Sequence, residues 1–403
     1  MKRSRIDTFI QDQEGLPEVT RQSLDALALE KLNALLKREK ERGGFYTGLP
    51  EQLDSLAELA SLPFTTDEDL AHRAGGMMLC SQGEVERVLS DATSGTTGAA
   101  KRVFYTEGDL EKTVRLYTAG LGELIFPGSV TMVCFPFSGP RGLGELIAEA
   151  IGRLGARPLC LGPGLSFGEY AAAMEREKPD TFVGMPVQLL SILRACGKGS
   201  LERALVSGDA CPESVTRACE EVLGAKLFPH YGSREMGMAG AITCPAHAGM
   251  HLRENDVLAE IIDPEGHVLP DGEFGELVIT TVGMEALPLI RYRTGDYTRI
   301  LSGRCPCGSE VKRLDTLRRE KKALDILALD KALFSLDALV DCRYRLTDGT
   351  LSITVLSAGA LAEAEIRNRV LPLLPEGVAL RIEIEPCRPE SRALYAGKRV
   401  TLT

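Results

Sequence analysis

The sequence contains no tryptophan, and aromatic residues make up only 5% of its 403 residues. No apolar run of roughly eighteen residues is present, and no apolar stretch follows the charged first residues, so we expect neither a membrane span nor a secretion signal. The formal net charge of −10 argues against a broad surface for nucleic acid or anionic membranes. These absences predict a soluble, cytoplasmic protein without a nucleic-acid or membrane partner.

A disulfide framework is disfavoured as well. The chain has 11 cysteines, an odd number, scattered along a long sequence. This distribution favours free thiols and leaves room for a metal site. The length exceeds one typical hydrophobic core, so we expect more than one domain.

From residue 106 onward, short apolar runs alternate with helical stretches. Residues Thr106–Asp109 form a capping box that begins a helix. Apolar runs separated by helices predict βαβ units and a largely parallel sheet, whose ligands bind beyond the carboxyl ends of the strands. The expected strands are 130–137, 157–161, 181–185, 203–207 and 226–229, and the expected helices are 142–154, 167–178, 187–195 and 212–223.

The C-terminal third of the sequence has a different pattern. Residues 255–300 are typical of an antiparallel meander, and the basic stretch 312–322 has few apolar residues, as linkers do. Residues 330–403 carry strands and helices in the size range of a small independent unit. The expected fold is α/β: a large N-terminal domain (1–312) with parallel βα layers plus an antiparallel β meander, followed by a small α+β C-terminal domain (313–403).

The segment Thr93–Lys101 concentrates hydroxyl groups, two glycines and a lysine. Glycine lets backbone N–H groups turn toward an anion, and hydroxyl and ammonium groups add donors for phosphate oxygens. The spacing of a Walker loop, which opens a helix, is absent. The alternative is a polar turn in a hairpin, because glycine-rich turns are common.

Further segments follow this loop in order: Tyr231–Gly237, Arg291–Asp296 and Ala396–Lys398. Together with the loop, they resemble the motifs of the adenylate-forming acyl-CoA synthetase superfamily. Within it, the sequence is most similar to the phenylacetate–CoA ligase-like branch. The segments that support this branch are Pro288–Asp296, Asp271–Val278 and Cys305–Gly308.

The resemblance implies an ATP-dependent enzyme, an acid–thiol ligase. In this family ATP and a carboxylic acid give an acyl-adenylate and pyrophosphate, and coenzyme A then takes the acyl group. A small carboxylic acid, ATP, Mg²⁺ and coenzyme A are therefore the expected ligands, and the C-terminal domain is expected to be a mobile lid. Because the reacting groups are anions, charge neutralisation and positioning dominate such catalysis.

The same resemblance assigns roles to individual residues. Lys101 and the loop would hold the β- and γ-phosphates, Glu235 would hold Mg²⁺, and Asp296 would accept hydrogen bonds from the ribose. Lys398 would bridge the acyl carboxylate and the α-phosphate, so Lys398, Glu235 and Lys101 are the implied catalytic residues. Tyr231 would border the adenine and Arg313 would reach the nucleotide. The implied ATP-binding residues are Thr93, Ser94, Gly95, Thr96, Thr97, Gly98, Tyr231, Gly232, Ser233, Arg234, Asp296 and Arg313.

Each role has a plainer alternative. Glu235 would cap a helix, Asp296 would begin a turn, and Lys398 would be a solvated lysine. The sequence also departs from the family pattern. Ala100 stands where proline is usual, Arg234 stands where threonine is usual, and the stretch after Asp315 lacks the expected hinge glycine.

A separate metal site is indicated by cysteines and histidines. Cys305 and Cys307 form a CxC pair, and Cys244 with His247 or His251 would complete a tetrahedral structural Zn²⁺ site. The resemblance favours His251, which gives the ligand set Cys244, His251, Cys305 and Cys307. Free thiols in two loops are the alternative.

The acyl pocket is expected in the loops that leave the strand ends. Arg141 would pair with a second polar group of the substrate or be an ordinary loop arginine. The candidate lining residues are Phe135, Arg141, Gly208, Asp209, Met236 and Gly237.

Two other functions stay open at this point. An adenylating enzyme would pass the acyl group to a protein or another acceptor than coenzyme A. A non-catalytic relative would bind a nucleotide without turnover. The oligomeric state also stays open, with a homodimer among the options.

Overall fold

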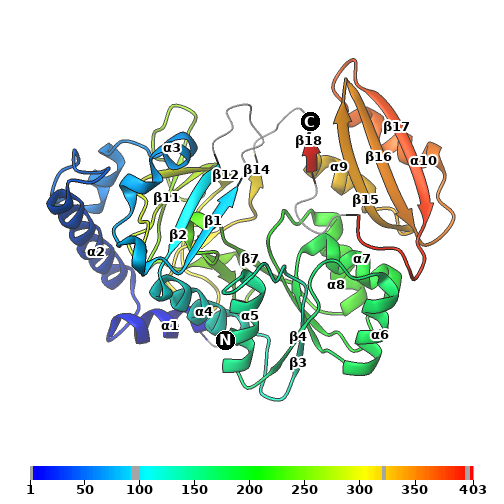
Figure 1. Cartoon of the computed structure of the whole chain (residues 1–403), viewed down its shortest axis with the longest axis horizontal. Helices are drawn as coiled ribbons and strands as arrows, with labels where there is room; N and C mark the ends of the chain where they lie inside the picture. Colours follow the sequence, from blue (N-terminus) through cyan, green and yellow to red (C-terminus); the bar gives the residue numbers. More distant parts are fainter. Residues whose placement is uncertain (1–2, 92–99, 320–323, 395–399, 403) are drawn as a thin grey trace. The chain divides into compact units, whose positions relative to one another are not determined.

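The computed structural model describes residues 3–91, 100–319, 324–394 and 400–402. The chain divides into two compact units: unit 1 consists of residues 1–123 and 230–320, and unit 2 consists of residues 124–229 and 321–403. Figure 1 labels many of the helices and strands of both units. In the described part of the chain, every helix is too short or too polar to cross a bilayer.

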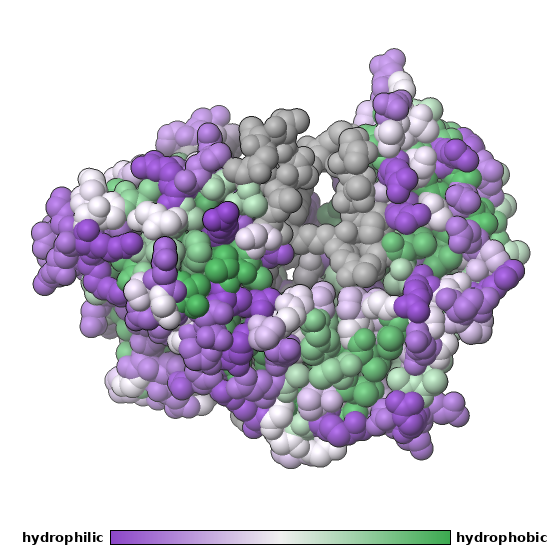
Figure 2. Space-filling model, in the orientation of Figure 1, coloured by the Kyte–Doolittle hydropathy of each residue, from purple (hydrophilic) through white to green (hydrophobic). Residues whose placement is uncertain are grey.

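Local sequence sets the helix ends of unit 1. Thr20 caps the start of α2 (Arg21–Arg42), and Gly43 ends this helix with a φ of 69°, a left-handed conformation that glycine adopts readily. Figure 2 shows a largely hydrophilic surface over α2, whose leucines face inward. The other helical segments of unit 1 are α1 (Arg5–Glu14), α3 (Asp67–Met77) and α4 (Glu107–Leu121), with the short turns η1 (Leu56–Ser61), η2 (Gln82–Glu84) and η3 (Arg234–Met236).

The strands of unit 1 are antiparallel. β1 (Arg87–Asp91) pairs with β2 (Lys101–Tyr105), which places Lys101 at the start of a strand. The expected meander is present as the sheet β10-β11-β12-β14. A third group is formed by β13, β9, β8 and the end of β7. The remaining bounds are β7 (Phe228–Tyr231), β8 (Ala241–Thr243), β9 (Met250–Leu252), β10 (Leu258–Ile262), β11 (Gly275–Thr280), β12 (Tyr292–Thr298), β13 (Arg313–Leu314) and β14 (Arg318–Arg319).

The predicted linker at 312–322 needs a correction. Its first part contains β13, which pairs with β9, and β14, which pairs with β12. Residues 313–319 therefore belong to unit 1, and the boundary predicted after residue 312 lies too early. The strands are two residues long and rich in arginine, so they carry no apolar alternation that would reveal them in the sequence.

The expected parallel βα pattern is present in unit 2. Its strands are parallel in the order β4-β3-β5-β6, followed by the first residues of β7. Figure 1 shows α5 on one side of β3 and β4, with α6, α7 and α8 on the other. The bounds are β3 (Val130–Val133), α5 (Leu143–Arg153), β4 (Arg157–Cys160), α6 (Phe167–Glu177), β5 (Thr181–Gly184), α7 (Pro186–Cys196), β6 (Arg203–Val206) and α8 (Glu213–Leu223).

The C-terminal part of unit 2 is an α+β element, as expected. Its sheet has the order β17-β16-β15-β18, and α10 packs against β17. Its elements are α9 (Ile326–Leu333), β15 (Leu339–Thr347), β16 (Thr350–Ser357), α10 (Glu363–Val370), η4 (Leu371–Leu373), β17 (Ala379–Pro386) and β18 (Val400–Leu402).

This element shares one hydrophobic core with the helices that cover the parallel strands. Leu329 of α9 and Val340 of β15 belong to the same buried cluster as Leu190 of α7. Arg194 of α7 donates hydrogen bonds to the carbonyl oxygens of Leu339 at 2.5 Å and Phe334 at 3.0 Å. The segment predicted as a separate lid is thus joined to α7 and α8 in this structure.

Candidate active site

Three polar side chains from distant parts of unit 1 meet around Lys101. The Nζ atom of Lys101 lies 3.2 Å from Oε1 of Glu235, 3.1 Å from Oδ1 of Asp67 and 3.3 Å from the hydroxyl of Tyr292. Burial by itself would lower the pKa of Lys101, but the carboxylates of Glu235 and Asp67 outweigh it and raise that pKa. The ammonium group is therefore charged and held at this position.

Tyr292 links the two carboxylates of this group. Its hydroxyl hydrogen-bonds Asp67 and lies 3.4 Å from Oε1 of Glu235. Burial, with Glu235 and Asp67 adding to it, raises the pKa of Tyr292, so the hydroxyl keeps its proton. The neighbouring Arg291 fixes this part of β12, because its guanidinium donates to the carbonyl oxygens of Ala60 and Leu62, each at 2.7 Å.

Asp67 and Tyr292 were not among the residues predicted for the site. Asp67 is the first residue of α3, where an acidic residue is already explained by the helix dipole. Tyr292 lies within the segment Arg291–Asp296, which supports the resemblance. Nothing in the sequence, however, distinguishes Tyr292 from its neighbours as a residue of the site. Contacts between such distant residues depend on the fold and leave no pattern in the sequence.

A tight turn around η3 positions Glu235. A Cβ atom at Gly232 would lie 2.6 Å from the carbonyl oxygen of Met238, so only glycine fits there. The hydroxyl of Tyr105 donates to the carbonyl oxygen of Arg234 at 2.7 Å. Arg253 donates to the carbonyl oxygen of Met236 at 3.0 Å. The turn is thus fixed through its backbone, which leaves the Glu235 side chain available to the site.

Asp296 and Tyr231 are also brought together. The hydroxyl of Tyr231, at the end of β7, donates to Oδ2 of Asp296 at 2.9 Å. Gly295 precedes Asp296 with a φ of 67°, and the pairing of β11 with β12 shifts register nearby. This irregularity in β12 is typical of a bulge that re-aims a side chain. A carboxylate can accept several hydrogen bonds, about two on each oxygen.

Arg313 has a different environment from the one that the resemblance implies. Its guanidinium donates to the carbonyl oxygens of Ala248 at 2.5 Å, Gly303 at 2.9 Å and Ser302 at 3.3 Å. The residue is 5% exposed and lies in β13, opposite His251. These contacts hold the Arg313 guanidinium against backbone carbonyl groups of unit 1.

The predicted pocket residues fall into both units and are described unit by unit. In unit 2, Gly208 has a φ of 85°, and a Cβ atom there would lie 3.1 Å from the ring of Phe135. Asp209 is exposed on the same loop. Arg141 pairs with Glu149 at 2.8 Å. In unit 1, Met236 is fully buried and the carbonyl of Gly237 accepts a hydrogen bond from Thr113 at 2.6 Å.

Thr93–Gly98 and Lys398 lie outside the described residues. These positions include most of the predicted phosphate loop and the lysine predicted to bridge the two reactants. Only the end of the loop, from Ala100 to Lys101, is described.

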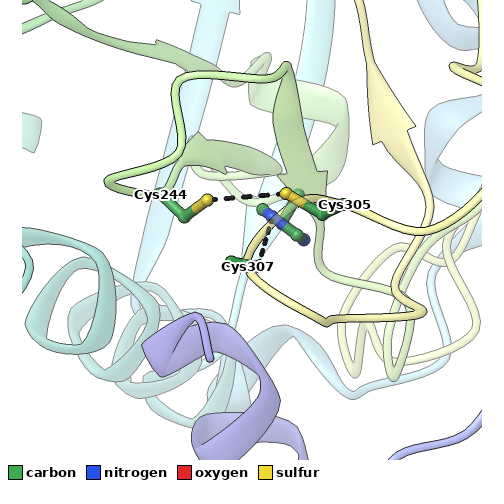
Figure 3. Close-up of side chains that lie close together, drawn as sticks. Cys244, Cys305 and Cys307 are labelled. Atoms are coloured by element: carbon green, nitrogen blue, oxygen red, sulfur yellow. Dashed lines mark hydrogen bonds between the residues drawn. The ribbon is translucent and has the colours of Figure 1, made fainter. Parts of the chain in front are cut away.

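The predicted zinc ligands form a buried cluster. The ligand atoms of Cys244, His251, Cys305 and Cys307 all lie within 4.8 Å of one another. The Sγ atoms of Cys244 and Cys305 are 3.7 Å apart, and Sγ of Cys307 is 3.7 Å from Nε2 of His251. Figure 3 shows the sulfur atoms of Cys244 and Cys305 pointing toward each other. His247 is not part of this cluster.

The chemistry of these groups fits a tetrahedral cation site. Ligand atoms about 2.0–2.3 Å from a tetrahedral zinc ion are separated from one another by roughly 3.4–3.8 Å. Burial lowers the pKa of His251 to about 4, with Arg313 adding to the effect, so the imidazole is neutral and able to bind a metal. Burial and the neighbouring thiols raise the pKa of Cys244, an effect that a bound cation would reverse.

Comparisons with known proteins identify sequences that are similar to this chain. The family model described as AMP-binding enzyme matches residues 92–285. The phenylacetate–coenzyme A ligase of Thermus thermophilus is 28% identical over 89% of this chain and 84% of its own length. The phenylacetate–coenzyme A ligase of Aromatoleum evansii is 31% identical over 72% of this chain and 69% of its own length.

Solved structures show the same fold. A 2-hydroxyisobutyryl-CoA ligase in the postadenylation state, in complex with an acyl-AMP, is 21% identical with a TM-score of 0.75, over 94% of this chain and 89% of that one. The same ligase with acyl-AMP and CoA, in the thioesterification state, gives a TM-score of 0.68 at 22% identity, over 95% of this chain and 90% of that one. The likeness confirms the predicted α/β fold.

Proposed function

The chain belongs to the AMP-binding enzymes, in the family of the phenylacetate–coenzyme A ligases, and from this membership we propose that it joins a small carboxylic acid to coenzyme A at the expense of ATP. The acid attacks the α-phosphorus of ATP, and the bond to pyrophosphate breaks as acyl-AMP forms. The thiol of coenzyme A then attacks the acyl carbon, and AMP leaves. The enzyme is an AMP-forming acid–thiol ligase.

One observation carries the first step. Lys101 and Glu235 are 134 positions apart in the sequence, yet their charged groups lie 3.2 Å apart in unit 1. A cation for phosphate oxygens and a carboxylate for a metal ion are therefore preplaced beside each other, which is what a reaction between two anions requires. The alternatives were that Thr93–Lys101 is a polar hairpin turn and that Glu235 caps a helix. Neither alternative would require the two charged groups to lie side by side.

Glu235 is the proposed ligand of Mg²⁺. Its side chain is 11% exposed, and a carboxylate oxygen together with phosphate oxygens is the donor set that this hard cation prefers. Bound Mg²⁺ would neutralise charge on the phosphates. Lys101 would share this task beside Glu235, and the loop Thr93–Gly98 would add backbone and hydroxyl donors.

Asp296 is the proposed ribose ligand. Its hydrogen bond with Tyr231 positions the carboxylate, and a carboxylate is a suitable acceptor for ribose hydroxyls. Tyr231 would therefore act through Asp296 and lie close to the nucleoside.

The other predicted residues have these proposed places. The phosphates would be bordered by Gly232, Ser233 and Arg234. Lys398 is proposed to meet the acid and the α-phosphate. The three carbonyl contacts of Arg313 support a structural role in place of the nucleotide contact.

The four-ligand cluster is the proposed structural zinc site. Three thiols and one imidazole would close the coordination sphere, so no position would remain for a reacting group. The site would fix the loop of Cys305 and Cys307 against the loop after β8. Its contribution is to stability, because it joins segments that are far apart in the sequence.

The proposed substrate is a small acid, in agreement with the ligase relatives. The residues proposed from the sequence to line the acyl pocket remain Phe135, Gly208, Asp209, Met236 and Gly237. The ion pair of Arg141 with Glu149 supports the ordinary loop role for this arginine.

Pyrophosphate release tests the function. Purified protein is incubated with ATP, Mg²⁺ and a panel of small aliphatic, aryl and dicarboxylic acids, with and without coenzyme A. Acid-dependent pyrophosphate release together with an acyl-CoA product is the expected result. Release that gives acyl-AMP and no thioester with coenzyme A would instead indicate another acceptor. ATP binding without any release would indicate a non-catalytic relative.

A further inference from the structure

The proposed reaction assigns no role to Asp67, although its acidic side chain contacts Lys101. Asp67 lies on α3, outside the segments that resemble family motifs, and Lys101 divides its contacts almost equally between Asp67 at 3.1 Å and Glu235 at 3.2 Å. The two carboxylates differ in environment, because the side chain of Glu235 is 11% exposed and that of Asp67 is 61% exposed. One ammonium group thus has a buried partner and a solvated partner at the same time.

We propose that Asp67, supported by Tyr292, is a positioning residue that holds Lys101 when Glu235 exchanges this lysine for Mg²⁺. The proposal rests on the function proposed above and concerns the step in which the magnesium–ATP complex enters the site. Glu235 can serve a cation only after its ion pair with Lys101 weakens. Asp67 gives the lysine a second partner on the solvent side, so the ammonium stays at the end of the phosphate loop.

The electrostatics explain why a second partner matters. Breaking a buried ion pair leaves an uncompensated charge, which is strongly unfavourable. With Asp67 in place, Lys101 does not lose all of its partners when Glu235 turns to the metal. Without Asp67, Glu235 would be the remaining carboxylate partner of Lys101 among the described residues, and the lysine would compete with Mg²⁺ for that carboxylate.

The surrounding structure fixes Asp67 and Tyr292 in position. The capping box of Thr66 and Asp69 sets the start of α3, so Asp67 is held at its first turn. Tyr292 hydrogen-bonds Asp67 through its hydroxyl, and its ring is 1% exposed. The capped helix start thus positions the backbone of Asp67, and burial of Tyr292 positions its hydroxyl.

The test is a Mg²⁺ titration of acid-dependent ATP–pyrophosphate exchange at saturating ATP and acid. Asp67→Asn should raise the Mg²⁺ concentration for half-maximal exchange about two- to fivefold, the range expected for an exposed ion pair. The KM for the acid should stay near the wild-type value. Asp67→Glu should restore most of the Mg²⁺ dependence.

A neighbouring residue provides the matched control. Glu68 is exposed in the same first turn of α3, so Glu68→Gln removes one charge from the same helix end. It should leave the Mg²⁺ titration unchanged. Tyr292→Phe should shift the titration in the same direction as Asp67→Asn, and the double variant should show less than the product of both effects, because the two residues act as one unit.

Two results would overturn the proposal: an unchanged Mg²⁺ requirement in Asp67→Asn, or an equal rise in Glu68→Gln. A failure of the proposed function is visible separately, as absence of exchange in the wild-type protein for every acid. In that case the contact is tested without nucleotide, by labelling with an amine-reactive ester and mass spectrometry. Asp67→Asn should speed the labelling of Lys101 and Glu68→Gln should not, and equal rates in both variants would contradict the contact.

Discussion

The ammonium group of Lys101 should supply a large part of the rate of adenylation. Lys101 is the cation that faces Glu235 and Asp67, and its side chain is 20% exposed. Lys101→Ala removes this charge and leaves two carboxylates beside the place where we expect an anionic triphosphate. The variant should therefore be impaired in the step that forms acyl-AMP, more than in folding.

The size of the effect follows from the charges. Two unit charges about 4 Å apart interact by roughly 4 kcal/mol at an effective dielectric constant of about 20. Loss of one preplaced charge or donor in an active site costs on the order of 10²–10³ in rate, about 3–4 kcal/mol. The two approaches agree, so we expect exchange of pyrophosphate into ATP to fall by about 10²–10³ in Lys101→Ala.

A second lysine of unit 1 serves as the control. Lys112 pairs with Glu285 at 2.9 Å and donates to the carbonyl oxygen of Gly283 at 2.8 Å, with a side chain that is 29% exposed. Lys112→Ala should alter exchange by less than about threefold, the factor of an exposed ion pair. Lys101→Arg keeps the charge and should recover part of the rate. Exchange near the wild-type rate in Lys101→Ala, or an equal loss in Lys112→Ala, would refute the phosphate-binding role.

Three further variants test the other assignments. Tyr231→Phe removes the hydrogen bond to Asp296 and should raise the KM for ATP several-fold, on the order of 1 kcal/mol; an unchanged KM would contradict the ribose assignment. Arg313→Ala should lower the free energy of unfolding by roughly 2–3 kcal/mol in denaturant titrations, because carbonyl oxygens lose their donor, whereas a raised KM for ATP without loss of stability would restore the nucleotide role. Cys305→Ser should lower bound zinc and the melting temperature together, while Cys160→Ser, at an exposed thiol, should change neither. Wild-type protein that purifies without metal and gains no stability from added zinc would remove the zinc proposal.

Features with local causes could be predicted from the sequence. The capping box of Thr106 and Asp109 begins α4 as expected, because its hydrogen bonds lie within one turn of helix. The alternation of apolar runs and helices gave the parallel strands of unit 2, since buried strands need continuous apolar residues. The strands end earlier than expected, as for β3, which stops at Val133. Apolar residues continue past it because Cys134 and Phe135 are buried as well.

Features with distant causes could not be predicted from the sequence. β14 is a strand because β12 lies beside it, and nothing within Arg318–Arg319 favours an extended chain over a linker. The likeness of motifs pointed to Lys101 and Glu235, but it gave no reason to include Asp67. The same limit applies to Arg313, because an arginine that binds carbonyl oxygens and one that binds a nucleotide look alike in a sequence.

The ion pair of Lys101 and Glu235 stabilises both charged groups before ligands bind. A lysine for phosphate and a carboxylate for metal are each costly to bury alone. Placed 3.2 Å apart, Lys101 and Glu235 neutralise each other until ligands arrive, so neither needs to be exposed to be stable. The incoming triphosphate and cation carry the opposite charges, and each can take over from one partner of the pair. The exchange conserves the number of paired charges when both ligands arrive together, as a metal–nucleotide complex does.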